Sequence, residues 1–91
     1  MSITIRVPAP LRNLTEDQSK ILIDASTISG LIEELESLFP GMKDRLVDEK
    51  GELRYFVNLY LNGEDVRFLN GVDTAVNSGD ELSIVPAVAG G

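Results

Sequence analysis

One amphipathic helix constrains the fold of this chain more than any other feature of its sequence. Apolar residues recur at helical spacing on one face of residues 28–39, and glutamates occupy much of the other face. Thr27 is a suitable N-cap, with Ser26 as the competing choice, and Pro40-Gly41 ends the helix. One such helix covers only one face of a sheet, which predicts an α+β architecture. The apolar positions are Ile28, Leu31, Ile32, Leu35, Leu38 and Phe39.

The rest of the chain has the alternating pattern of half-buried strands. Asn62-Gly63 predicts a tight hairpin turn, across which residues 66–68 pair back as a short strand. Residues 42–46 predict a further short helical turn, and the first and last strands are expected side by side at the centre. We therefore predict a four- to five-stranded mixed sheet with the main helix on one face, which is the β-grasp arrangement of ubiquitin. The longer predicted strands are residues 3–7, 20–24, 55–61 and 81–85.

Composition excludes several kinds of chemistry. The 91 residues include no cysteine and no histidine, which removes thiol nucleophiles, thiolate metal sites, and the commonest general base. A net charge of −7 repels nucleic acid and anionic membranes and suits a basic protein partner. Glu33, Glu34 and Glu36 are expected to form a solvated helix face, so no metal site is predicted. With no signal peptide or membrane span in the pattern, we expect a cytoplasmic protein.

The last six residues are the candidate reactive segment. They carry only small or short side chains, so residues 86–91 are predicted to leave a 1–85 domain as a flexible arm. Gly90 and Gly91 have no Cβ, which lets another protein's backbone or a reactive phosphate approach closely. The terminal carboxylate of Gly91 is therefore the predicted reactive group. The alternative is an ordinary loose terminus, which most domains have.

The face of the sheet opposite the helix is a candidate docking surface. If Leu82 and Ile84 face the helix, then Phe56, Tyr60 and Val85 lie on the open face, together with Leu22. An exposed apolar patch beside the arm is typical of a protein-binding surface. The alternative is that the loop of residues 8–19 covers this patch. Glu64 and Asp65 form either a rim for a basic partner or a polar turn.

Two runs carry a resemblance to a known family. The sequence resembles the ubiquitin-like sulfur-carrier proteins, which include the small subunit of molybdopterin synthase and the thiamine sulfur carrier. It is most similar to the sulfur carrier of the thiocarboxylate-dependent pathway of cysteine biosynthesis. The runs are residues 56–68, which end in Glu64-Asp65-Val66-Arg67-Phe68, and residues 83–91, which end in Pro86-Ala87-Val88-Ala89-Gly90-Gly91.

The resemblance implies a protein cosubstrate and not an enzyme. An adenylyltransferase of the ubiquitin-activating type would use ATP to activate Gly91, and a sulfur donor would then convert it to a thiocarboxylate. A pyridoxal-phosphate cysteine synthase or another acceptor would take the sulfur, and a metallopeptidase would release cysteine. ATP and pyridoxal phosphate would belong to these partners, so the chain itself needs no cofactor. Residues 86–89, Pro86, Ala87, Val88 and Ala89, would contact the partners.

Three other functions fit the same residues. The chain could be a molybdopterin synthase small subunit, or a ubiquitin-like modifier conjugated through Gly91 to lysines of other proteins. It could also be a binding module in which the Gly-Gly end is incidental.

Overall fold

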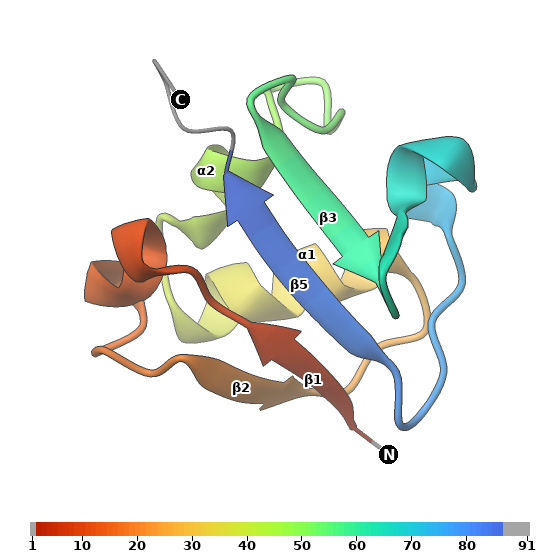
Figure 1. Cartoon of the computed structure of the whole chain (residues 1–91). Coiled ribbons are helices and arrows are strands. Elements are labelled where there is room, and N and C mark those ends of the chain that lie inside the picture. The colour runs from red at the N-terminus through yellow and green to blue at the C-terminus, as the bar shows by residue number, and fades with distance from the viewer. Residues whose placement is uncertain (1, 87–91) are drawn as a thin grey trace.

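A five-stranded sheet with one long helix across its back forms the body of the protein (Figure 1). The computed structural model describes residues 2–86. The strands are β1 (Ile3–Arg6), β2 (Lys20–Ile23), β3 (Val57–Leu61), β4 (Glu64–Asp65) and β5 (Glu81–Pro86). The helices are α1 (Ile28–Leu38) and α2 (Met42–Leu46), and the 3-10 turns are η1 (Ala9–Leu14), η2 (Val66–Phe68) and η3 (Gly71–Asp73).

The strand order is β2-β1-β5-β3-β4, so the last strand lies at the centre of the sheet. β1 and β5 run parallel, with Ile5 opposite Leu82, and the other neighbouring pairs are antiparallel. A parallel pair needs a crossover, and α1 crosses behind the sheet between β2 and β3 (Figure 1). This arrangement confirms the predicted mixed sheet and the β-grasp fold, with the first and last strands side by side.

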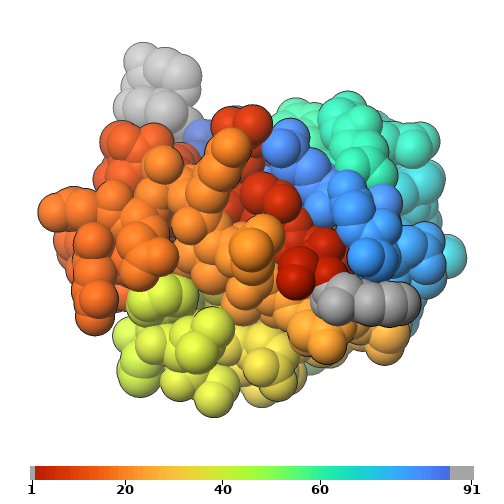
Figure 2. Space-filling view, turned by 90° about the horizontal axis from the view of Figure 1, so that it is seen from below, coloured from red at the N-terminus to blue at the C-terminus, as the bar shows by residue number. Residues whose placement is uncertain are grey.

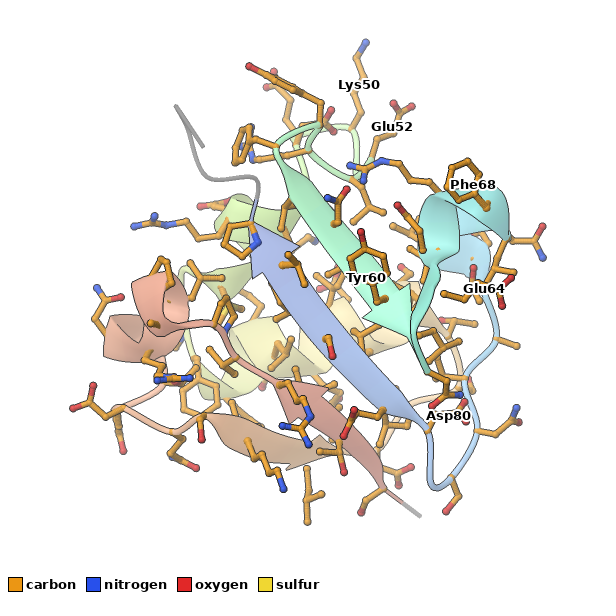
Figure 3. The ribbon with its side chains drawn as sticks, in the orientation of Figure 1. Lys50, Glu52, Tyr60, Glu64, Phe68 and Asp80 are labelled. Carbon is orange, nitrogen blue, oxygen red and sulfur yellow. The ribbon has the colours of Figure 1, made fainter. Side chains whose placement is uncertain are left out.

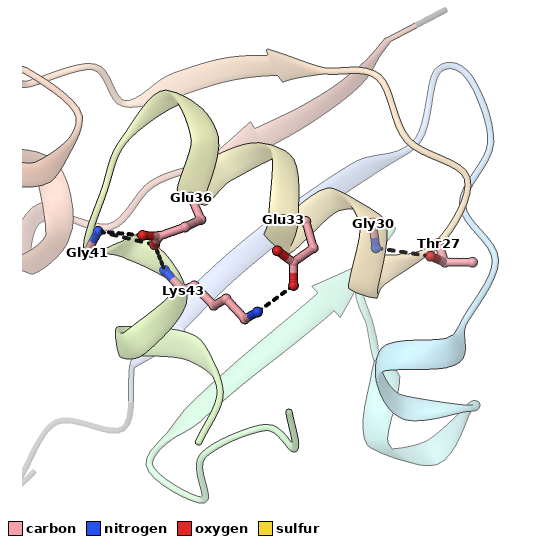
Figure 4. Close-up of polar contacts among 6 residues, drawn as sticks. All are labelled: Thr27, Gly30, Glu33, Glu36, Gly41 and Lys43. Atoms are coloured by element: carbon pink, nitrogen blue, oxygen red, sulfur yellow. Dashed lines mark hydrogen bonds and ion pairs between the residues drawn. The ribbon is translucent and has the colours of Figure 1, made fainter. Parts of the chain in front are cut away.

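The core lies between the sheet and α1. Ile5, Leu59 and Leu82 of the sheet and Leu35 of α1 are fully buried. The hydroxyl of Thr27 accepts a hydrogen bond from the Gly30 amide at 3.0 Å, which confirms Thr27 as the N-cap (Figure 4).

Leu38 does not belong to the buried face of α1, contrary to the prediction. It is 55% exposed, because it lies at the margin of the apolar stripe in the last turn of the helix. Phe39 follows the helix as its C-cap and is half-buried against the core.

Glu36 has a structural function, although it was predicted only as part of a solvated helix face. Its carboxylate accepts hydrogen bonds from the amides of Gly41 at 3.1 Å and Lys43 at 2.9 Å, and so caps the start of α2 (Figure 4). Gly41 has a φ of 102°, the left-handed conformation that glycine tolerates best. Glu33 pairs with the Lys43 ammonium (Figure 4), so two glutamates of α1 fix the position of α2.

The segment after the Asn62-Gly63 turn differs from the prediction. The turn itself is confirmed, since Asn62 and Gly63 both have positive φ. The paired strand, however, is Glu64–Asp65, and residues 66–68 form the 3-10 turn η2. The Asp65 carboxylate accepts a hydrogen bond from the Arg67 amide at 2.9 Å, which bends the chain away from the sheet.

The loop of residues 8–19 contains η1, which buries Leu11 in the core. The predicted end of the last strand was wrong, because β5 continues to Pro86, one residue further, and pairs there with Val57. Proline is tolerated at this position because it lies at the end of the strand.

Substitution of Leu35 with alanine should remove a fully buried side chain from the interface between helix and sheet. We expect Leu35→Ala to lower the free energy of unfolding by about 2–5 kcal/mol, because the cavity is only partly filled by relaxation. Leu38→Ala, the same substitution at an exposed position of the same helix, should change it by about 0.5 kcal/mol or less. Urea denaturation measures both, and equal losses would contradict the assignment of Leu38 to the surface.

Candidate functional site

The candidate site begins where β5 ends. Pro86 is the last described residue and pairs with Val57, the first residue of β3. Residues 87–91 lie outside the described residues. They include the predicted reactive residues Gly90 and Gly91 and the predicted contact residues Ala87, Val88 and Ala89. The site can therefore be described by the surface around the end of β5. This surface comprises the open face of the sheet and the segment that leads into β3 (Figure 3).

Tyr60 and Val85 lie on the open face, as predicted. Leu82 and Ile84 of β5 are buried, and the alternation of the strand brings Val85 to the opposite face, where it is 41% exposed. Tyr60 is half-buried and lies on β3 opposite Ser83 (Figure 3). Leu11 of the 8–19 loop packs into the core while Val85 stays exposed, so the alternative that this loop covers the face is wrong.

The apolar surface is smaller than the predicted patch. Leu22 is exposed, but it lies on β2 at the edge of the sheet that Figure 2 views, separated from β5 by β1. Polar side chains occupy the space between them, including the ion pair of Arg6 and Glu81 at 2.8 Å. Apolar side chains of the open face are therefore concentrated beside the end of β5 and not spread across the sheet.

Phe56 lies in the segment before β3, and its aromatic neighbour is Tyr55 instead of Tyr60. The two rings are 5.4 Å apart at 81°, an edge-to-face pair. Tyr55 is 90% exposed and Phe56 is 42% exposed. Tyr55 was predicted to lie inside a strand, so its exposed position before β3 was not predicted. The first amide of β3, that of Val57, instead donates to the Arg54 carbonyl at 3.2 Å and closes a turn.

Arg67 connects three parts of this surface. Its guanidinium donates hydrogen bonds to the Asn58 side chain at 2.6 Å and to the Arg54 carbonyl. Arg54 in turn donates from Nε to the Asp44 carbonyl at 2.7 Å. The segment of residues 54–56 is thus tied to β3, η2 and α2, although it has no regular secondary structure itself. Arg67 belongs to a run that carries the family resemblance, but this role was not predicted from the sequence.

Glu64 and Asp65 make up β4, and Asp65 caps η2. This confirms the polar hairpin. Asp65 lies opposite Tyr60 of β3, on the open face, so a rim for a basic partner stays a prediction.

The loop before Arg54 is organised by Asp48. Its carboxylate accepts hydrogen bonds from the amides of Lys50 at 2.9 Å and Glu52 at 3.0 Å. The hydrogen bond from the Glu52 amide has the largest effect on the pKa of Asp48 and lowers it from the usual value of 3.8, because it stabilises the charged form. In contrast, the hydrogen bond to Glu33 raises the pKa of Lys43.

The described residues offer no other candidate site with clear chemistry. Within residues 2–86 no group of three or more acidic side chains is arranged to hold a metal ion. In that same range, no helix has the length and apolarity needed to cross a bilayer.

Comparison with known proteins identifies relatives along the whole chain. The model of the ThiS family matches residues 5–91. The sequence is 42% identical to the sulfur carrier protein CysO of Mycobacterium tuberculosis and 39% identical to a putative sulfur carrier protein of Archaeoglobus fulgidus, covering 100% of both chains in each comparison. The fold matches a chain of the crystal structure of the Amycolatopsis orientalis BexX/CysO complex with a TM-score of 0.93 and 42% identity, over 98% of this chain and 99% of that one.

The Asp48 carboxylate should titrate below its usual pKa of 3.8. Because the pKa in the folded state is lower than in the unfolded chain, the stabilisation from this group is present above pH 3.8 and is lost as the pH falls through the folded value. Carboxyl chemical shifts measured by NMR against pH give the pKa, and the protection factor of the Glu52 amide against hydrogen exchange should fall over the same range. A pKa at or above 3.8 would contradict the hydrogen-bonding role of Asp48.

Proposed function

The chain belongs to the ThiS family of ubiquitin-like sulfur carriers, and on this premise we propose that its sulfur is carried as a thiocarboxylate on Gly91 and used for cysteine biosynthesis. The observation that carries this proposal is the full-length similarity to CysO, at 42% identity. In this proposal residues 87–91 form an arm, and the β-grasp body up to Pro86 presents it to partner enzymes.

The chemistry follows from the reactivity of a carboxylate. A carboxylate is a poor electrophile, so the terminal oxygen first attacks the α-phosphorus of ATP, and pyrophosphate leaves. A sulfur nucleophile then attacks the carbonyl carbon of the acyl adenylate, and AMP leaves with the electron pair of the broken C–O bond. The chain has no cysteine, so no internal thiol competes for the activated acyl group.

The partners supply the groups that this chain lacks. We propose an adenylyltransferase of the ubiquitin-activating type for the first step and a pyridoxal-phosphate cysteine synthase as the sulfur acceptor. A metallopeptidase would then release cysteine from the carrier. ATP and pyridoxal phosphate would be bound by these enzymes and not by the carrier, which acts as their cosubstrate. Because the first step consumes ATP, we propose the cytoplasm as its location.

The position of β5 supports delivery of the terminal group. β5 is paired with β1 as far as Ser83 and with β3 as far as Pro86, where the described residues end. Gly90 and Gly91 have no side chain to obstruct a narrow channel, which suits an active site that must close around an acyl adenylate.

Incubation of the full chain with ATP, the adenylyltransferase encoded in the same genome and a sulfide source should replace one terminal oxygen with sulfur. Intact-mass spectrometry should detect a mass increase equal to the difference between one sulfur atom and one oxygen atom. Deletion of Gly91 should abolish the increase and leave the melting temperature unchanged, because a terminal glycine buries little surface.

Each alternative function has its own result in this experiment. Lysine-linked conjugates without a thiocarboxylate would indicate a protein modifier and contradict the proposal. A thiocarboxylate that transfers no sulfur to the cysteine synthase would contradict the cysteine pathway and favour another acceptor, such as molybdopterin synthase. No mass change in the wild-type chain would leave only a binding module.

A further inference from the structure

We propose that the segment Arg54–Phe56, held in place by Arg67, is a docking ridge for the enzyme that activates the terminal carboxylate. This inference rests on the proposed function. It concerns a surface of the body, separate from residues 87–91, that recognises the enzyme. The enzyme is expected to present an apolar surface with a carboxylate beside it.

The first argument is the position of the ridge. Phe56 directly precedes Val57, which pairs with Pro86, the last residue of β5. An enzyme that binds the residues following Pro86 must therefore approach within contact distance of this segment. In Figure 1 the loop that contains the ridge stands at the same end of the sheet as the end of β5.

The second argument is exposure. A tyrosine that is 90% exposed and a phenylalanine that is 42% exposed form a ring pair in a chain with only five aromatic residues. The guanidinium of Arg54 lies 5.8 Å from the centre of the Phe56 ring, a cation–π contact. Tyrosine and arginine are the side chains most enriched among the residues that dominate binding energy.

The third argument is rigidity. Four hydrogen bonds hold the backbone and the arginine of the ridge: from the Arg54 amide to Leu46, from Arg54 Nε to Asp44, from the Val57 amide to Arg54, and from the Arg67 guanidinium to Arg54. An irregular segment with this many contacts loses little conformational freedom on binding. The backbone that carries the two exposed aromatic residues is thus anchored through Arg54, which is suited to recognition.

Charge defines the chemistry of the partner. The protein has a net charge of −7, but the ridge and its support carry two arginines. In the described part of the chain, neither arginine forms an ion pair, and Arg54 donates a hydrogen bond only from Nε. The terminal N–H groups of Arg54 are therefore suited to a partner carboxylate, next to the apolar surface of Tyr55 and Phe56.

The test compares two exposed aromatic residues of the full-length chain. Tyr55→Ser removes the most exposed ring of the ridge, and Phe68→Ser removes a ring that is 84% exposed on η2, at the opposite edge of the sheet from β2 (Figure 3). We expect Tyr55→Ser to weaken binding to the adenylyltransferase about tenfold, measured by calorimetry without ATP, because exposed aromatic anchors contribute on this scale. It should raise the KM for the carrier similarly and leave kcat unchanged, whereas Phe68→Ser should change none of these values.

Arg67→Lys tests the support of the ridge. Lysine carries one compact ammonium and cannot reproduce the two hydrogen bonds that the guanidinium donates to Asn58 and to the Arg54 carbonyl. We expect a higher KM with unchanged kcat and a urea midpoint close to that of the wild-type chain. If this variant does not fold, Tyr55→Ser with its control still decides the question.

The outcomes separate this inference from the proposed function. Equal dissociation constants for wild type and Tyr55→Ser would overturn the docking ridge, even if the thiocarboxylate forms. Absence of wild-type binding would also overturn it. Tyr55-dependent binding without any mass gain would support the ridge and overturn the sulfur-carrier mechanism.

Discussion

The pairing of β5 with strands on both sides is the constraint on which the rest of the structure depends. β1 lies beside it in parallel, and β3 pairs with it in the antiparallel direction from Leu82 to Pro86. The parallel contact requires a crossover, which places α1 behind the sheet and buries one face of every strand that it covers. The last strand is therefore central in the sheet, and its end at Pro86 is held by pairing with Val57 of β3.

The two faces of the sheet have different functions as a result. α1 and the sheet bury Ile5, Leu35 and Leu59 between them, so the stability of the body comes mainly from this side. The acidic side chains of α1 also contribute, since Glu36 caps α2 and Glu33 pairs with Lys43. In the described structure no second helix or strand layer covers the open face. Substitutions of Tyr60 or Val85 would therefore leave the core unaltered.

Local patterns predicted those parts of the fold that depend on local forces. The alternation of Ile3 and Ile5, the cap at Thr27 and the turn at Asn62-Gly63 each fix a conformation within a few residues, and all three predictions are confirmed. The strand predicted at residues 66–68 was wrong because Asp65 offers the Arg67 amide a hydrogen bond that competes with sheet pairing.

The errors at the candidate site have a different origin. The Arg67 guanidinium contacts the Arg54 carbonyl thirteen residues earlier, and no sequence period reports such a contact. Tyr55 was consequently assigned to a strand, and its edge-to-face contact with Phe56 was not predicted. Gly90 and Gly91 were selected by their chemistry and by the family resemblance, and they lie outside the described residues. Tertiary contacts thus determine the surface, whereas the reactive terminal group stays a prediction from the sequence.

A chain without cysteine or histidine has few ways to perform chemistry on an acyl group of its own, so in the proposed function recognition by partner enzymes is its principal task. A terminal Gly-Gly carries little information by itself, because it offers only backbone groups to a partner. Specificity must then come from residues that lie close to the end of β5 but belong to the rigid body. Tyr55 and Arg54 meet both conditions, since Val57 joins their segment to Pro86 through the sheet. In the proposed function, a reactive end with little side-chain information and a separate recognition surface on the body would let several enzymes act on the same carboxylate and still distinguish this carrier from other proteins.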